Sequence, residues 1–144
     1  MNLPALVARR VIRQVSPSEA ARLCEVVHGH PGPLVVVTDD AYQGWLYEPN
    51  LHPRSLFWDL AERADPDRHF VVKCDGATKE LVFFSSRVGF LTTTATGEAE
   101  TALLSKLKYV VRGTVGPASG PAMAMTLAAL RAHTGVVSAT NTGF

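Results

Sequence analysis

Apolar residues recur at helical spacing in four segments of the chain. The clearest segment follows Ser16, with Pro17 at the first helical position and Glu19 where a capping box places its carboxylate. Gly29 then supplies a natural stop for this helix. The pattern predicts helices over residues 17–28, 53–64, 98–111 and 121–133.

Short β-branched or aromatic runs lie between these helices. The pairs Asp39–Asp40 and Asp75–Gly76 carry turn signals, so each is expected to reverse the chain between two strands. The first pair would join a buried strand to a hairpin partner, and the second would open a meander. The predicted strands cover residues 33–38, 42–48, 69–74, 81–84 and 88–92, with a last edge strand at 136–137.

This element order predicts an α+β fold. We expect a mainly antiparallel sheet of hairpins and a meander, with about four helices packed on it. The chain has 144 residues, of which 47% are hydrophobic, so one core can form. We therefore interpret residues 1–144 as a single α/β domain.

Charge and cysteine usage narrow the function only a little. Fourteen basic and thirteen acidic residues leave a formal net charge of +1, which argues against a protein built mainly on phosphate attraction. The two cysteines are too few for a disulfide scaffold. No signal peptide and no apolar run of membrane-spanning length is recognised, so a cytoplasmic protein without a membrane partner is expected.

The strands carry apolar residues on both alternating faces, at 34–37, 70–72 and 81–84. Such strands need cover on both sides, from helices or from a partner. This favours self-association or a protein partner. The residues predicted to contact that partner are Trp45, Tyr47, Phe83 and Arg87.

Metal binding has a weak signature. Cys24 and His28 would share a helix face, with His30 just beyond and His52 in a later loop. A buried cysteine that acts as a small hydrophobic residue, beside histidines at a helix end, explains the same pattern. We predict no metal site.

Catalytic and cofactor motifs are also missing. Ser85 and Ser86 follow an apolar strand, but the G-x-S-x-G pattern of a nucleophile elbow is absent. Neither phosphate-binding glycine motif occurs. Asp39–Asp40 and Asp65–Asp67 are read as turn residues, and no cofactor is predicted.

Two alternatives stay open. The first is a small enzyme or ligand-binding domain with a pocket between sheet and helices, using His52, His69, Ser86 or Arg87. The second is a nucleic-acid-binding protein that uses a cluster of arginines near the start of the sequence, with strand aromatics to stack bases. That cluster is Arg9, Arg10 and Arg13.

From residue 56 to about 115 the chain resembles the PATAN-type bacterial signalling domain. The stretches that carry the resemblance are Leu56–Leu60, Glu80–Val88, Gly97–Leu104 and Arg112–Val115. Two positions depart from the family pattern: Arg68–His69 replaces a Thr-Gly pair, and Ser86 replaces a glycine. The resemblance implies a non-enzymatic interaction or regulatory module, in the company of response regulators or small GTPase circuits.

Overall fold

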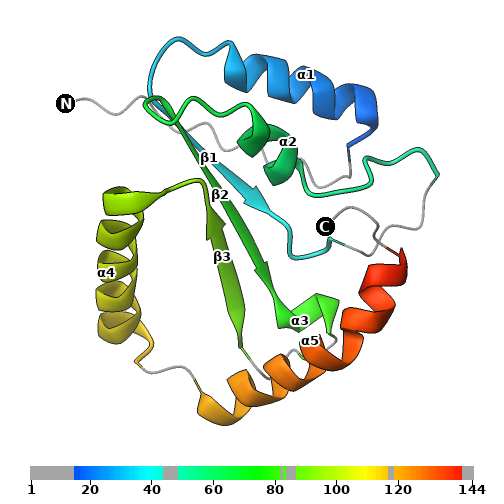
Figure 1. The fold of residues 1–144 in the computed structure, drawn as a ribbon, viewed down its shortest axis with the longest axis vertical. Helices are drawn as coiled ribbons and strands as arrows, with labels where there is room; N and C mark the ends of the chain where they lie inside the picture. Colours follow the sequence, from blue (N-terminus) through cyan, green and yellow to red (C-terminus); the bar gives the residue numbers. More distant parts are fainter. Residues whose placement is uncertain (1–14, 44–48, 82, 84–86, 117–118, 141–144) are drawn as a thin grey trace.

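The computed structural model describes residues 15–43, 49–81, 83, 87–116 and 119–140 (Figure 1). The described elements follow one another as α1 (Pro17–His28), β1 (Leu34–Asp39), α2 (Leu56–Glu62), β2 (His69–Gly76), α3 (Ala77–Glu80), β3 (Gly89–Thr93), α4 (Gly97–Thr114) and α5 (Gly120–Thr140).

The sheet has three strands in the order β1-β2-β3, and it is mixed. β1 pairs with β2 in parallel, with Leu34 opposite His69, whereas β2 and β3 are antiparallel. The predicted mainly antiparallel sheet is therefore wrong. The physical reason is the connection after β1: it contains α2, and a crossover through a helix returns the chain in the same direction.

The predicted hairpins fail at identifiable positions. The expected partner strand at 42–48 begins in a turn at Tyr42 and Gln43, and its other residues lie outside the described ones. Asp75 and Gly76 do not form a turn but finish β2, and the one-turn helix α3 follows directly. The predicted edge strand at 136–137 is part of α5. The described residues contain five helices rather than four, because the one-turn helix α3 was not predicted.

The helix predictions are confirmed in position. α1 spans the residues expected, and its capping box is complete: Ser16 accepts from the Glu19 backbone N–H, and the Glu19 side chain accepts from the Ser16 N–H. Each bond satisfies an N–H that has no partner inside the helix. The predicted strands at 33–38, 69–74 and 88–92 are also present, with shifted ends.

The core lies on one face of the sheet. α1 and α2 pack there, and the buried cluster consists of Cys24, Phe57, Leu60 and Val71. Leu60 is 1% exposed and Val71 0%. Figure 1 shows α1 and α2 together on one side of the strands, with α4 and α5 at the opposite margin of the molecule.

The other face of the sheet is open. Val35 and Val37 alternate with core residues along β1 and are 64% and 60% exposed. Leu91 of β3 is 46% exposed, and α4 has no buried residue. No helix in the described part of the chain has the length and apolar character needed to cross a membrane.

Candidate functional site

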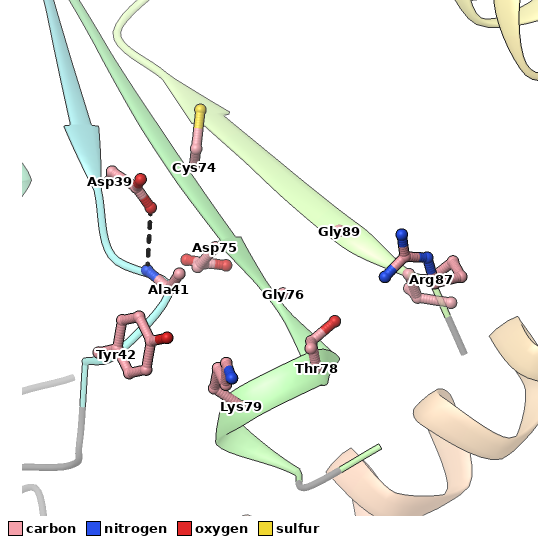
Figure 2. A pocket seen from close by; sticks show the side chains of 11 residues that line it. Asp39, Ala41, Tyr42, Cys74, Asp75, Gly76, Thr78, Lys79, Arg87 and Gly89 are labelled. Atoms are coloured by element: carbon pink, nitrogen blue, oxygen red, sulfur yellow. Dashed lines mark hydrogen bonds between the residues drawn. The ribbon is translucent and has the colours of Figure 1, made fainter. Parts of the chain in front are cut away.

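A cavity of about 440 Å³ lies where the carboxyl ends of β1 and β2 meet the start of β3 (Figure 2). Small-molecule sites have volumes of ~300–1,000 Å³, and in α/β sheets they lie beyond the carboxyl ends of parallel strands. The side chains with chemistry at its wall are Asp39, Tyr42, Cys74, Asp75, Thr78, Lys79 and Arg87.

The wall from β1 is an aspartate turn. Asp39 ends the strand, and its Oδ1 accepts from the Ala41 N–H at 3.3 Å. The Gln43 N–H donates to the Asp40 carbonyl at 2.9 Å, which closes the turn one residue later. Aspartate favours such turns because its side chain bonds to the backbone two residues on. The turn presents the Asp39 carboxylate and the Tyr42 ring to the cavity.

The side of the cavity formed by the end of β2 and by α3 contributes the amine of Lys79. Gly76 ends the strand, α3 begins at once, and Lys79 stands in its single turn. The Lys79 Nζ lies 5.2 Å from the centre of the Tyr42 ring, within the distance of a cation–π contact. A half-buried amine and an aromatic ring that are far apart in the sequence therefore meet across the cavity.

Arg87 forms the opposite end of the cavity, and Figure 2 shows it beyond the glycines of β2 and β3. Its backbone has φ +52°, a left-handed conformation that is uncommon for a residue with a side chain. Gly76 permits the close approach, because a Cβ there would lie 3.0 Å from the Val88 carbonyl oxygen. Arg87 therefore lines the same cavity as Thr78 and Lys79.

Charges around the cavity keep its thiol protonated. Burial raises the pKa of Cys74, and the carboxylates of Asp39, Asp75 and Asp40 raise it further. Asp75 itself is paired with Lys73 in a largely buried ion pair. The Cys74 thiol is therefore kept in its protonated form, which is not the nucleophilic one.

Behind the aspartate turn lies a second carboxylate that does not face the cavity. Ser55 donates to Asp40 through a short hydrogen bond, and Ser55 is 4% exposed. Burial raises the pKa of the Asp40 carboxyl, while the Ser55 hydroxyl and Lys73 act in the lowering direction.

A second cavity of about 300 Å³ lies between α1 and α2 and is lined in part by Cys24, His52 and Asp59. His52 Nε2 is 2.7 Å from Asp59 Oδ2, and Arg54 bonds the other carboxylate oxygen at 2.7 Å. Burial raises the pKa of the Cys24 thiol, so it is protonated. The described residues contain no group of three or more metal-ligating side chains.

The structure brings only one predicted contact residue into the main cavity, Arg87. Phe83 is half-buried after α3 and does not line it. The pocket residues proposed with Arg87 are dispersed: His69 is buried in β2, and His52 lines the other cavity. Trp45, Tyr47, Ser86, Arg9, Arg10 and Arg13 lie outside the described residues.

Sequence reasoning missed Lys79 and the role of Asp39 and Tyr42. A lone lysine is a common surface residue, and Asp39–Asp40 was sufficiently explained as a turn. Two sequence features could have indicated the site. A short turn with aspartate and tyrosine follows one apolar strand, and a lysine follows the next strand closely. Only the parallel register of those strands makes the two stretches neighbours.

The fold is a mixed sheet with helices, and it has a cavity of small-molecule size at the carboxyl ends of its two parallel strands. A family model described as aminotransferase class I and II matches residues 15–142, and the chain belongs to this family. No curated protein sequence matches the chain.

This membership overturns the resemblance to the PATAN-type domain and, with it, the predicted non-enzymatic signalling module. The stretches that carried that resemblance are mostly structural: an apolar helix, an apolar strand and a capped helix occur in many folds. The alternative of a small enzyme with a pocket agrees better with the family and the cavity.

Proposed function

We propose that this chain contributes the cofactor site of a pyridoxal-phosphate-dependent enzyme that transfers amino groups. The proposal rests on one observation: in a chain of the aminotransferase family, the main cavity gathers an amine, a carboxylate and a guanidinium. When bound, pyridoxal phosphate supplies an aldehyde for covalent attachment and a pyridinium ring that acts as an electron sink.

The donor set of the cavity fits that cofactor. The Lys79 Nζ lines the cavity and would be the amine that bonds the aldehyde carbon. The Asp39 carboxylate suits the protonated ring nitrogen, and the planar guanidinium of Arg87 suits a phosphate. The hydroxyl groups of Tyr42 and Thr78 add donors between these charged groups.

Each residue would then have a definite task. Asp39 would hold a proton at the ring nitrogen, and Arg87 would fix the anionic end of the cofactor. Lys79 would hold the cofactor covalently and, once released from it, would move a proton as a general base at Nζ. Tyr42, beside Lys79, would orient the ring through its hydroxyl and shield the amine with its own ring.

The first test is covalent attachment. Pyridoxal phosphate is added to the protein, the product is trapped with borohydride, and the modified peptide is identified by mass spectrometry. We expect modification at Lys79 and a new long-wavelength absorbance band. The Lys79→Ala variant should lose both, whereas Lys106→Ala, which removes an exposed lysine of α4, should keep both.

Modification spread over several lysines, or equal modification of Lys79→Ala and wild type, would remove this proposal. An aminotransferase assay with amino-acid donors then asks whether the loaded site is active.

Two further expectations from the sequence remain proposals. Self-association is supported by the exposed Val35, Val37 and Leu91 on the open sheet face, and sedimentation velocity would test it. A cytoplasmic location is supported by free thiols at Cys24 and Cys74, which suit a reducing compartment.

A further inference from the structure

We infer that Asp40 and Ser55 form a positioning pair that holds the Asp39–Gln43 turn in the geometry the cofactor requires. This inference rests on the proposed pyridoxal-phosphate site. The pair touches neither the cavity nor any reacting group, so its role is to place residues that do.

The turn has two faces because consecutive residues at a strand end point to opposite sides of the sheet. Asp39 pairs in register with Cys74, and both line the cavity. Asp40 instead reaches Ser55, at the start of α2 on the core side. The backbone N–H of Asp40 also donates to the Cys74 carbonyl at 2.8 Å. Fixing Asp40 therefore fixes the residues on either side of it.

The other end of the pair is anchored in the core. Ser55 is the N-cap of α2, and its Oγ accepts from the Phe57 N–H at 3.1 Å. Phe57 and Leu60 of that helix are 2% and 1% exposed. A continuous path thus leads from the buried cluster through α2 and Ser55 to Asp40.

The side chains that the turn places at the cavity are exposed, so packing does little to hold them. Asp39 and Tyr42 are exposed, and Tyr42 is 60% exposed. Within the turn itself, the Ala41 N–H donates to the Asp39 carboxylate and the Gln43 N–H donates to the Asp40 carbonyl. A cofactor site depends on side chains that neighbouring residues hold in place. The partly buried Ser55–Asp40 bond adds such a constraint from outside the turn.

Three variants separate positioning from simple helix capping. Asp40→Ala removes the acceptor but leaves Ser55 free to cap α2. Ser55→Ala removes both functions, and Ser55→Thr retains a hydroxyl for both. Ser16→Ala is the matched control, because it deletes the N-cap of α1, which does not line the main cavity.

The first measurement needs no ligand. Amide hydrogen exchange reports local opening, and we expect Asp40→Ala and Ser55→Ala to speed exchange of the Ala41 and Gln43 amides by about tenfold. Ser55→Thr should restore the slow exchange. Ser16→Ala should leave these amides unchanged.

The second measurement is pyridoxal-phosphate affinity, followed by absorbance. Each of Asp40→Ala and Ser55→Ala should weaken binding about tenfold, the loss expected for one hydrogen bond. The double variant should lose no more than either single variant, because the two side chains act as one unit.

The outcomes are distinguishable. If wild type fails to bind pyridoxal phosphate, the proposed function is overturned, and the link from the pair to the cofactor falls with it. If wild type binds but Asp40→Ala binds equally well, or exchange of the turn is unaffected, the positioning role is wrong. Additive losses in the double variant would also overturn it.

Discussion

The two faces of the sheet differ in what their residues do. On the core face, Val71 of β2 and the α2 residues Leu60 and Phe57 are almost fully buried where α1 and α2 pack against the sheet. On the open face, Val35 and Val37 remain exposed, and the cavity opens beside them at the strand ends. Burial on one face stabilises the fold, and the other face stays accessible to a ligand. The Asp40–Ser55 hydrogen bond connects the turn at the cavity to α2 on the core face.

The largest effect that would test this division is the loss of a core side chain. Leu60→Ala should lower the free energy of unfolding by about 2–5 kcal/mol, because it removes buried apolar volume and leaves a cavity. The same substitution at Leu104, which is 48% exposed on α4, should change stability by less than about 0.5 kcal/mol. Urea unfolding of both variants measures the difference, and equal losses would contradict the division.

A smaller effect is expected at the start of α1. Ser16→Ala removes the hydroxyl that accepts from the Glu19 N–H and should cost about 1 kcal/mol of stability. Pyridoxal-phosphate affinity should not change, since α1 packs on the core face. Thermal unfolding and a binding titration on the same sample measure both quantities. A matching loss of affinity would mean that the two faces are not separable.

The smallest expected effect is a change in how the free energy of unfolding depends on pH. Burial acts to raise the pKa of Asp59, but hydrogen bonds from Arg54 and His52 outweigh it and hold that pKa below its ordinary value of 3.8. A depressed carboxylate pKa stabilises the fold above the unfolded pKa, and this stability is lost as pH falls through the folded one. The contribution should be about 0.2–1 kcal/mol, because the partners are partly exposed.

Asp59→Asn should remove this part of the pH dependence below about pH 4 and leave Lys79 modification intact. The measurement is unfolding free energy against pH for wild type and variant. Parallel curves over that range would show that the Asp59 cluster contributes nothing.

Local patterns predicted the helices well. The capping box at Ser16 and Glu19, the apolar stripes and the stop at Gly29 are interactions within a few residues, so the sequence states them directly. The pairing of the strands was harder to predict from the sequence. Aspartates at 39–40 are compatible both with a hairpin turn and with the start of a crossover connection. Glycine at 76 is likewise compatible with a turn or with a close contact between strands.

The sequence by itself determined where the helices form and which strand residues are apolar, because both depend on short-range spacing. The tertiary structure alone decided that β1 and β2 run in parallel. That register places the aspartate turn beside Lys79, 40 positions away from Asp39 in the chain (79 minus 39), and brings Arg87 to the same cavity. Long-range pairing is set by the whole core, and no local pattern contains it.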